Sequence, residues 1–156
     1  MGLTAADVME TDFYTVHPDT PIPDAVKAFR EAARKHERRV FGMMVVDEQD
    51  RLVGMISMYD ILVLMRPKHI HIWGEMNDID VAEFINEVLN RSQSIRVGDL
   101  MTTEVITATP DTHLLLIVDV MLRKHIRRIP VVDGGKVVGI VHISNLFFHI
   151  MENTHI

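Results

Sequence analysis

A short segment, 54–60 (GMISMYD), carries residue types whose spacing suits recognition of a sugar phosphate. It joins an apolar run to a helical pattern, so Ser57 and Asp60 are expected at the start of a helix. A helix N-terminus offers free N–H groups and positive potential to a phosphate. The carboxylate of Asp60 can accept hydrogen bonds from both hydroxyls of a ribose, and Ser57 adds a hydroxyl group that can donate. The segment therefore predicts a ligand site at a strand–helix junction.

The same segment also fits a purely structural role. Ser-x-x-Asp is close to a capping box, in which the Ser57 side chain accepts from the N–H of Asp60 and the carboxylate reaches back to the N–H of Ser57. On this motif alone the sequence favours the cap, and the ligand role stays open beside it.

Two basic clusters follow the first helical pattern of each half of the chain. They are 35–39 (KHERR) and 124–128 (KHIRR). Lysine and arginine at a helix C-terminus complement the helix dipole, which is a structural explanation. Their recurrence, while neighbouring residues diverge, equally favours a shared role for Arg127, Arg128 and their counterparts in binding an anion.

The chain consists of two copies of one unit. In the second copy, 129–132 and 137–141 are apolar runs on either side of an Asp-Gly-Gly turn, which is a strong hairpin signal. The segment 43–60 repeats this strand–turn–strand–helix order. Further upstream, a motif that begins at Asp7 (DVMxTxxxT) returns at Asp99 (DLMxTxxxT). Two such copies predict paired units that share a core rather than a long array.

Each copy is expected to open with an extended segment, 13–16 in the first and 105–108 in the second. A proline follows each segment and disfavours helix before it. The next aspartates, Asp19 and Asp111, are suited to helix starts. The first helix is expected over 22–36, where alanines form an apolar stripe.

Two further helical patterns are clear. Between the copies, Asp80 has the position of an N-cap with Glu83 three residues on, and 81–89 then shows helical apolar spacing. The helix of the second copy, Leu114–Leu122, is apolar nearly all round. One apolar stripe is enough to cover a sheet, so the other face needs a partner. We expect a homodimer through Leu114–Leu122 and the last helix, Leu146–Ile150.

Composition excludes several functional classes. The sequence has no cysteine, which rules out disulfides and thiolate chemistry and agrees with a reducing compartment. A net charge of −6 argues against nucleic acid as a partner. No apolar run approaches the ~18 residues of a membrane span, and the N-terminus lacks a signal-peptide pattern, so we expect a cytoplasmic protein. No Ser-His-Asp setting, carboxylate pair or Gly-rich phosphate loop is recognisable, so we expect no enzyme.

A metal site is a weaker hypothesis. His69 and His71 alternate on one side of an extended segment, with Trp73 and Glu75 close by, and two imidazoles at this spacing can share a metal. No third ligand at a recognisable spacing completes the set. We therefore expect no metal site, and the role of the His69-His71-Trp73 segment stays open.

The whole pattern resembles a stand-alone tandem pair of CBS domains, also called a Bateman module. The tandem pattern covers residues 3–151 and consists of an h-T-h-x-P opening, an amphipathic helix, an h-P-V-V-D strand and an h-h-G-h-h-[ST]-x-x-D ending. The resemblance implies an α+β fold of two β-α-β-β-α repeats, packed through their sheets into one module. Repeat 1 would occupy 3–65, a linker with its own helix 66–94, and repeat 2 95–151. In this family two modules usually associate into a flat disc.

The resemblance also implies a ligand: an adenosine nucleotide (AMP, ADP or ATP) or a related adenosyl compound, bound in clefts between the repeats with no required cofactor. On this sequence Asp60 would hold the ribose and Ser57 would approach the phosphate. Arg128, together with Arg127, would reach a phosphate tail in the central groove. The base pocket of the first copy would be lined by Thr15, Val16, Pro18, Met43 and Met44.

The second copy departs from the family pattern. Its Ser position holds His142 and its Asp position holds Asn145. Asparagine is uncharged and does not match a carboxylate as an acceptor, whereas histidine can fill the pocket or meet a phosphate when protonated. We expect a better site around Asp60 and a weaker or altered one around Asn145. The base-pocket equivalents in this copy are Thr107, Ala108, Pro110, Ile129 and Pro130.

The sequence therefore predicts a regulatory module that senses an adenosyl ligand and signals to a separate partner protein, which the sequence does not name. The alternative is a ligand-free subunit for protein interaction or oligomerisation. A ligand that binds only the folded state raises its stability, so melting experiments with ligands separate the two.

Overall fold

The computed structural model describes residues 2–35, 40–66 and 80–154. The fold is mixed α+β, as expected, and divides into two compact units. Unit 1 contains Met1–Tyr14, Val46–Leu52 and Glu104–Ile156, and unit 2 contains Thr15–Val45 and Val53–Thr103. Each unit therefore combines parts of both sequence copies. Within the described ranges, no helix is long and apolar enough to cross a membrane.

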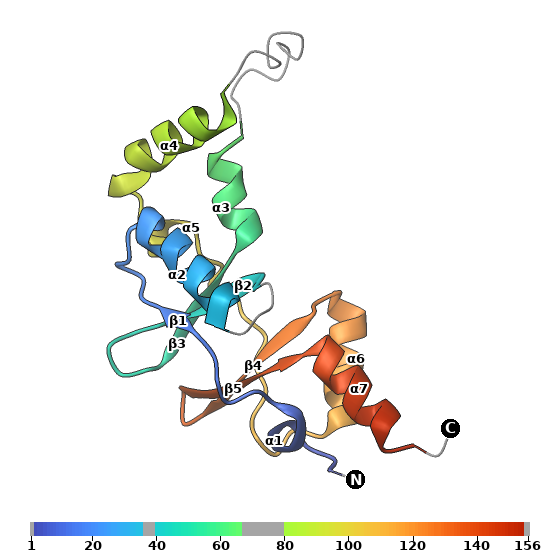
Figure 1. Cartoon of the computed structure of the whole chain (residues 1–156). Helices are drawn as coiled ribbons and strands as arrows, with labels where there is room; N and C mark the ends of the chain where they lie inside the picture. Colours follow the sequence, from blue (N-terminus) through green and yellow to red (C-terminus); the bar gives the residue numbers. More distant parts are fainter. Residues whose placement is uncertain (1, 36–39, 67–79, 155–156) are drawn as a thin grey trace. The chain divides into compact units, whose positions relative to one another are not determined.

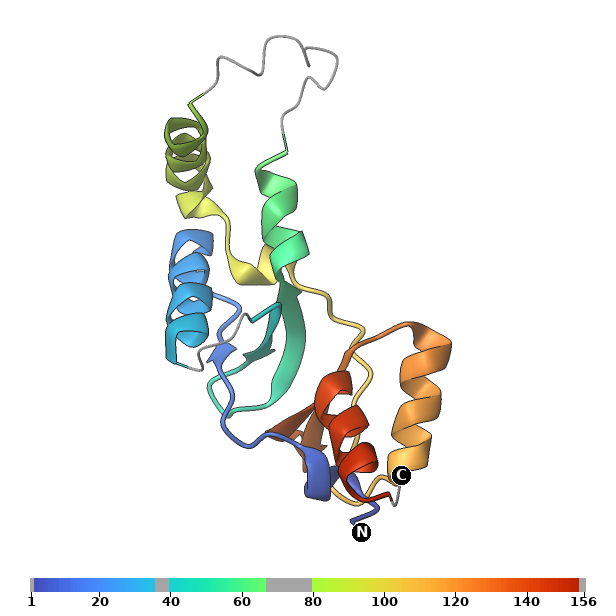
Figure 2. The ribbon, with the colours of Figure 1, turned by 45° about the vertical axis from the view of Figure 1, so that its right-hand side comes forward.

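Unit 2 is built on a three-stranded sheet. Its elements are β1 (Thr15–Val16), α2 (Ile22–Lys35), β2 (Gly42–Val46), β3 (Leu52–Ser57), α3 (Met58–Leu64), α4 (Val81–Arg91), the 3-10 helix η2 (Ser92–Ser94) and α5 (Val97–Leu100). The strand order is β1-β2-β3, and α3 continues directly from β3 (Figures 1 and 2). β1 pairs in parallel with β2, which places Thr15 opposite Met44 and Val16 opposite Val45.

Two helices of unit 2 follow the sequence pattern. In α2, Ala25 and Ala32 of the predicted stripe are fully buried. Asp80 caps α4 as expected, because its carboxylate accepts from the N–H of Glu83 at 3.2 Å. Val88 is the buried residue of this helix. The 3.6-residue periodicity of the sequence therefore predicts both helices and their buried faces.

Unit 1 is built on a two-stranded hairpin. Its elements are α1 (Ala5–Val8), α6 (Leu114–Lys124), β4 (Arg128–Asp133), β5 (Lys136–His142) and α7 (Ile143–Glu152). Alternate residues of β4 face the core, so Arg128 and Pro130 fall on the opposite face of the hairpin. The two long helices lie against the hairpin (Figure 2) and share with it a core of buried residues: Ala5, Val8, Ala108, Leu114, Ile117, Met121, Ile129, Val131, Val141 and Leu146.

The predicted hairpin turn is confirmed. Gly134 and Gly135 have φ angles of 60° and 84°, which glycine adopts without steric cost and which a two-residue hairpin turn requires. The first copy closes its hairpin differently. The Asp47 carboxylate accepts from the N–H of Gln49 at 2.9 Å and from that of Arg51 at 3.0 Å. This turn also has a left-handed residue, Asp50 with φ of 61°, so the first copy combines a positive φ angle with side-chain hydrogen bonds.

The residues that open each predicted repeat, before its first extended segment, fold into the unit that holds most of the other repeat. We call these segments the first leader (residues 2–12) and the second leader (residues 95–103). In unit 1, the N–H of Ala5 donates to the carbonyl of Thr112 at 2.9 Å. In unit 2, the N–H of Val97 donates to the carbonyl of Thr20 at 2.8 Å. The leaders are therefore exchanged, which the sequence did not predict.

Each leader also pairs with the last strand of its unit. In unit 1 the N–H of Glu10 donates to the carbonyl of Ile140 at 2.8 Å, and the N–H of Ile140 donates back at 3.0 Å. In unit 2 the N–H of Met55 donates to the carbonyl of Thr102 at 2.9 Å, and the N–H of Thr102 donates back at 2.8 Å. The repeated leader motif therefore marks a repeated backbone contact.

This contact explains two glycines. A Cβ on Gly54 would lie 2.7 Å from the carbonyl oxygen of Thr102, and a Cβ on Gly139 would lie 2.6 Å from the Met9 sulfur and 3.0 Å from the carbonyl oxygen of Glu10. Real Cβ atoms do not approach other atoms so closely. Glycine is therefore required at Gly54, where the close atom belongs to the backbone, whereas at Gly139 the Met9 side chain would have to move and the Glu10 carbonyl would be tight.

Two expected helix starts are wrong. His113, not Asp111, is the N-cap of α6, because its ring Nδ1 accepts from the N–H of Leu115 at 3.1 Å. In the first copy, α2 begins at Ile22, so Asp19 lies in the turn before it. Histidine is an uncommon cap, which is why residue preferences alone pointed to the aspartates.

The extended segments are shorter than expected. Only the last two residues of 13–16 form a strand, and only Ala108 of 105–108 pairs, with Val131. In the second copy Pro130 has no N–H to donate. The parallel pairing with β4 therefore does not extend from Ala108 back toward residue 105.

We predict that Gly54→Ala destabilises the protein by about 1–3 kcal/mol, because the new methyl group would overlap a backbone oxygen that is fixed by the Thr102–Met55 bridge. Urea unfolding followed by circular dichroism measures the effect. Lys136→Ala, at the exposed start of β5, is the control and should stay within about 0.5 kcal/mol of the wild type. A Gly54→Ala variant as stable as this control would contradict the close approach.

Candidate functional site

Ser57 and Asp60 form the capping box that the sequence predicts. Ser57 is the N-cap of α3. Its N–H donates to Asp60 Oδ2 at 2.8 Å, and its hydroxyl donates to the same oxygen at 3.0 Å. The hydroxyl also accepts from the N–H of Asp60 at 3.2 Å. The structural interpretation of this segment is therefore confirmed.

The cap leaves part of the Asp60 carboxylate available. Both bonds that this carboxylate accepts go to Oδ2, and no hydrogen bond to another described residue uses Oδ1. The side chain is half-buried. A carboxylate has about four acceptor positions, so capping the helix and accepting ligand hydroxyls are compatible.

β2 ties this cap to the predicted base pocket. The N–H of Met58 donates to the carbonyl of Phe41 at 2.9 Å, which joins the start of α3 to the residue before β2. The parallel pairing of β1 with β2 then places Thr15 beside Met44. Unit 2 therefore holds the whole predicted set of the first copy on adjoining elements: Thr15, Val16, Pro18, Met43, Met44, Ser57 and Asp60.

The exposure of these pocket residues differs. Thr15 is exposed and Pro18 is half-buried. Val16 is 5% exposed, and Met43 and Met44 are each 1% exposed. The two methionines therefore belong to the core of unit 2. A ligand contact with their side chains stays a prediction, whereas Thr15 presents its side chain at the surface.

Unit 1 holds the second predicted set on equivalent elements. The N–H of Ile143 donates to the carbonyl of Arg127 at 2.9 Å, which repeats the contact of Phe41 with the start of α3. Arg127 and Arg128 therefore stand where the first copy has Phe41 and Gly42. In the rest of the set, Thr107 is exposed, Pro110, His142 and Asn145 are half-buried, and Ala108, Ile129 and Pro130 are buried.

His142 meets a residue that the sequence did not predict. Its Nε2 lies 3.3 Å from Oε2 of Glu10, and the two side chains are 26% and 24% exposed. His142 is the N-cap of α7, but its side chain makes no capping hydrogen bond. Among the described residues, the amide of Asn145 has no side-chain hydrogen bond. The second set therefore has no capping box, and at this position an imidazole contacts a carboxylate instead.

Arg128 lies directly opposite His142 in the β4–β5 ladder, so their side chains share the face of the hairpin that is turned away from the core. Burial, and then the charge of the adjacent Arg127, lower the pKa of Arg128 below its ordinary value. No ion pair joins either arginine to a residue within 2–35, 40–66 or 80–154. A guanidinium stays charged in proteins, so a poorly solvated one favours an anionic partner.

Other predicted residues lie outside the described ranges. These are His36, Arg38 and Arg39 of the first basic cluster and the 69–75 segment with its two histidines and Trp73. In the part of the chain that the structure describes, no group of three or more histidine, aspartate or glutamate side chains could hold a metal ion.

Glu10 and Thr102 are the site residues that sequence reasoning missed. Each follows the methionine of a leader motif and pairs with the last strand of its unit. The signal was the recurrence of this motif together with Gly54 and Gly139, since such glycines indicate a close backbone approach. Only the structure shows that the leaders are exchanged.

Comparison with known proteins identifies the repeat. The family model described as CBS domain matches residues 5–67 and 97–152. CBS domain-containing protein CBSX1, a chloroplastic protein of Arabidopsis thaliana, is 30% identical over 148 residues, covering 86% of this chain and 58% of the relative. CBSX2 of the same plant is 28% identical, covering 93% of this chain and 62% of the relative. The chain thus spans less than two thirds of the length of these relatives.

Solved structures share the fold. The crystal structure of the CBS-pair protein CBSX2 from Arabidopsis thaliana has a TM-score of 0.75 and 28% identity, covering 99% of this chain and 100% of that chain. The structure of CBSX2 in complex with AMP has a TM-score of 0.69 with coverages of 97% and 98%. The CBS pair of protein MJ0100, in complex with 5′-methylthioadenosine and S-adenosyl-L-methionine, has a TM-score of 0.65 at 24% identity, covers 99% of each chain and shows likeness of fold alone.

Proposed function

Because the chain belongs to the CBS domain family, we propose that it is a regulatory module that binds an adenosine nucleotide or another adenosyl ligand and signals its occupancy to a separate protein. The Asp60 carboxylate carries the proposal, since it is half-buried at the start of α3 and Oδ1 is unused by the described residues. CBSX2, which is 28% identical, is known in complex with AMP. AMP is therefore the first ligand to test.

The proposed contacts follow from the chemistry of the side chains in unit 2. The Asp60 carboxylate accepts hydrogen bonds from the ribose hydroxyls, and bonds to a charged group contribute about 1.5–3 kcal/mol each. The cap holds this carboxylate in place before the ligand arrives, so little side-chain freedom is lost on binding. Thr15 and Pro18, which keep exposed surface beside β2, meet the base.

Of the two sets of residues, the one around Asp60 is proposed to bind more tightly. Asn145 has the equivalent position in unit 1, but a neutral amide accepts more weakly than a carboxylate. The arginines of unit 1, Arg127 and Arg128, favour a ligand with a phosphate group there. The two sets are therefore proposed to differ in which part of a nucleotide they hold best.

The remaining expectations belong to the same proposal. The chain acts by binding and not as an enzyme, requires no cofactor and works in the cytoplasm; the two Arabidopsis relatives are chloroplastic by name. The alternative is a subunit that docks a partner protein without a ligand. It is favoured if no adenosyl compound changes the stability of the protein.

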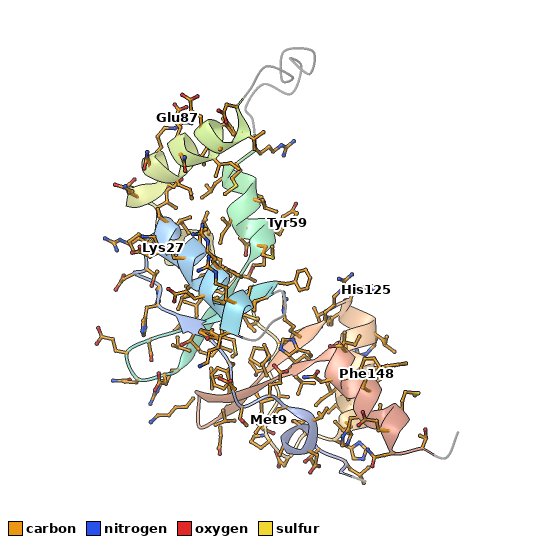
Figure 3. All side chains as sticks on the ribbon, in the orientation of Figure 1. Met9, Lys27, Tyr59, Glu87, His125 and Phe148 are labelled. Carbon is orange, nitrogen blue, oxygen red and sulfur yellow. The ribbon has the colours of Figure 1, made fainter. Side chains whose placement is uncertain are left out.

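A homodimer is proposed from apolar side chains that the single chain leaves exposed. On α6, Leu115, Leu116 and Leu122 are 68%, 53% and 63% exposed, although Leu114, Ile117 and Met121 are buried. On α7, Phe147 and Phe148 are 54% and 60% exposed, and the labelled Phe148 projects from its helix in Figure 3. The expected segments Leu114–Leu122 and Leu146–Ile150 therefore each have one face in the core and one without cover.

We predict that AMP raises the thermal midpoint of the wild type by several degrees in a thermal-shift assay, and that Asp60→Asn removes most of this shift. Asparagine keeps an oxygen for the Ser57 N–H, so the cap survives, but it loses the negative charge; the expected loss of affinity is about tenfold. ADP, ATP and S-adenosylmethionine complete the panel.

The matched control for this experiment is Asn145→Asp, which places a carboxylate at the equivalent position of unit 1 and should preserve or increase the shift. Equal shifts in the wild type and in Asp60→Asn would contradict the assignment of the ribose contact to Asp60. If none of these compounds changes the thermal midpoint of the wild type, the alternative of a ligand-free docking subunit is favoured.

We predict a dimer at micromolar concentration by light scattering coupled to gel filtration. Introducing a charge with Leu116→Glu or Phe148→Glu should produce monomers, because a carboxylate would be buried unpaired at the interface. Lys136→Glu, on the hairpin turn, is the charge-change control and should remain dimeric. A wild-type monomer at tens of micromolar would overturn the dimer.

A further inference from the structure

Three ionisable side chains of unit 1 lie in a row on the outer face of its hairpin: Arg128, His142 and Glu10. Arg128 is the cross-strand neighbour of His142, and His142 contacts Glu10 at 3.3 Å. Arg128 has no carboxylate partner among the described residues, and burial lowers its pKa. The row therefore places two cation-forming groups side by side and a single carboxylate at one end.

Glu10 is held beside His142 by its own backbone. Two backbone hydrogen bonds join it to Ile140, which lies two residues before His142 and so on the same face of β5. The absence of a side chain at Gly139 admits the leader at this point. The carboxylate therefore reaches His142 from a backbone that hydrogen bonds hold in place, and a change of its side-chain torsions moves it away from the imidazole.

Unit 2 shows that this row is not a requirement of the fold. The equivalent of Glu10 is Thr102, that of His142 is Ser57 and that of Arg128 is Gly42. The backbone contacts are the same in both units, but unit 2 has neither the cation-forming groups nor the carboxylate at these positions. All three positions thus differ between the two units, and in unit 1 they hold residues of complementary charge.

We propose that Arg128 and His142 form an anion subsite of unit 1 and that Glu10 is its internal counter-ion, which a phosphate group must displace in order to bind. A phosphate brings more negative charge and more acceptor oxygens than one carboxylate, so it can pair with both cations at once. In the ligand-free state Glu10 contacts His142, so an anion must displace it in order to bind, and this sets a threshold for binding. That the phosphate is part of an adenosyl nucleotide rests on the function proposed above.

Displacement has a consequence beyond affinity. When phosphate replaces Glu10, the released carboxylate belongs to the first leader, whose backbone is bonded to the last strand of unit 1. Binding of an anion in unit 1 would thus change the surroundings of the first leader, which lies at the start of the chain. Weak or small anions, which cannot outcompete Glu10, leave the leader in its ligand-free state.

The test is an NMR titration of the intact protein with sodium pyrophosphate at pH 6.0, below the ordinary imidazole pKa of about 6.5. The ring signals of the nine histidines are followed, and His142 is assigned by its absence in His142→Gln. Glu10→Gln keeps the size of the side chain and removes its charge. We expect the pyrophosphate concentration for half-maximal shift of His142 to fall about threefold to tenfold in Glu10→Gln.

Two further variants make the result specific. Glu104→Gln removes the same charge from an exposed position of unit 1 and should leave the half-maximal concentration within about twofold of the wild type. Arg128→Met keeps the apolar part of the side chain and removes its charge. This variant should raise the pyrophosphate concentration for half-maximal shift about tenfold. If Glu10→Gln binds pyrophosphate no better than Glu104→Gln, or if His142 never responds, the subsite is overturned. A response of His142 in a protein that AMP does not stabilise would support the subsite and count against the proposed function.

Discussion

The constraint on which both units depend is the close approach of a leader to the last strand of a hairpin. It needs Gly54 in unit 2, because a Cβ there would overlap a backbone oxygen of the leader, and it is eased by Gly139 in unit 1, where a Cβ would press on the Met9 side chain and the Glu10 carbonyl. Reciprocal backbone hydrogen bonds of 2.8 to 3.0 Å then join leader and strand. Since the leaders are exchanged, neither copy of the repeat completes its unit alone. The duplication is thus a structural requirement and not a mere doubling of sites.

The same constraint explains how two sites with one backbone geometry come to differ. Each unit takes a side chain from the leader of the other copy, which is Thr102 in unit 2 and Glu10 in unit 1. In unit 2 the leader residue is neutral, and Ser57 and Asp60 form a capping box in which Asp60 is half-buried. In unit 1 the acidic leader pairs with His142. The two units therefore differ in charge at the leader position, which is neutral in unit 2 and acidic in unit 1.

Local features were predictable from the sequence because their physical causes are local. The Asp-Gly turn requires only positive φ angles at Gly134 and Gly135, and the Ser57–Asp60 box closes within four residues. The Asp80 cap forms over the same distance. The usual preference of aspartate for helix N-caps nevertheless gave a wrong prediction for α6, because His113 caps this helix.

Features that depend on distant residues were not predictable in the same way. The contact between Glu10 and His142 joins opposite ends of the chain, and no spacing within the sequence announces it. The sequence did show that His142 and Asn145 depart from the pattern of the first copy, but not what they face. The predicted ligand contacts of Met43 and Met44 depend on how far a ligand penetrates, and their burial in the core leaves only their neighbours Thr15 and Pro18 at the surface.

The central claim is that the carboxylate of Asp60 holds the ribose of an adenosyl ligand. The most direct measurement is a calorimetric titration of the wild-type protein with AMP and with its 2′,3′-dideoxy analogue, which has the same base and phosphate but no hydroxyl for the carboxylate. The account predicts that AMP binds and that the analogue binds at least about tenfold more weakly, because the bonds to a charged group are lost. Equal affinity for the two compounds, or heat from neither, would contradict it.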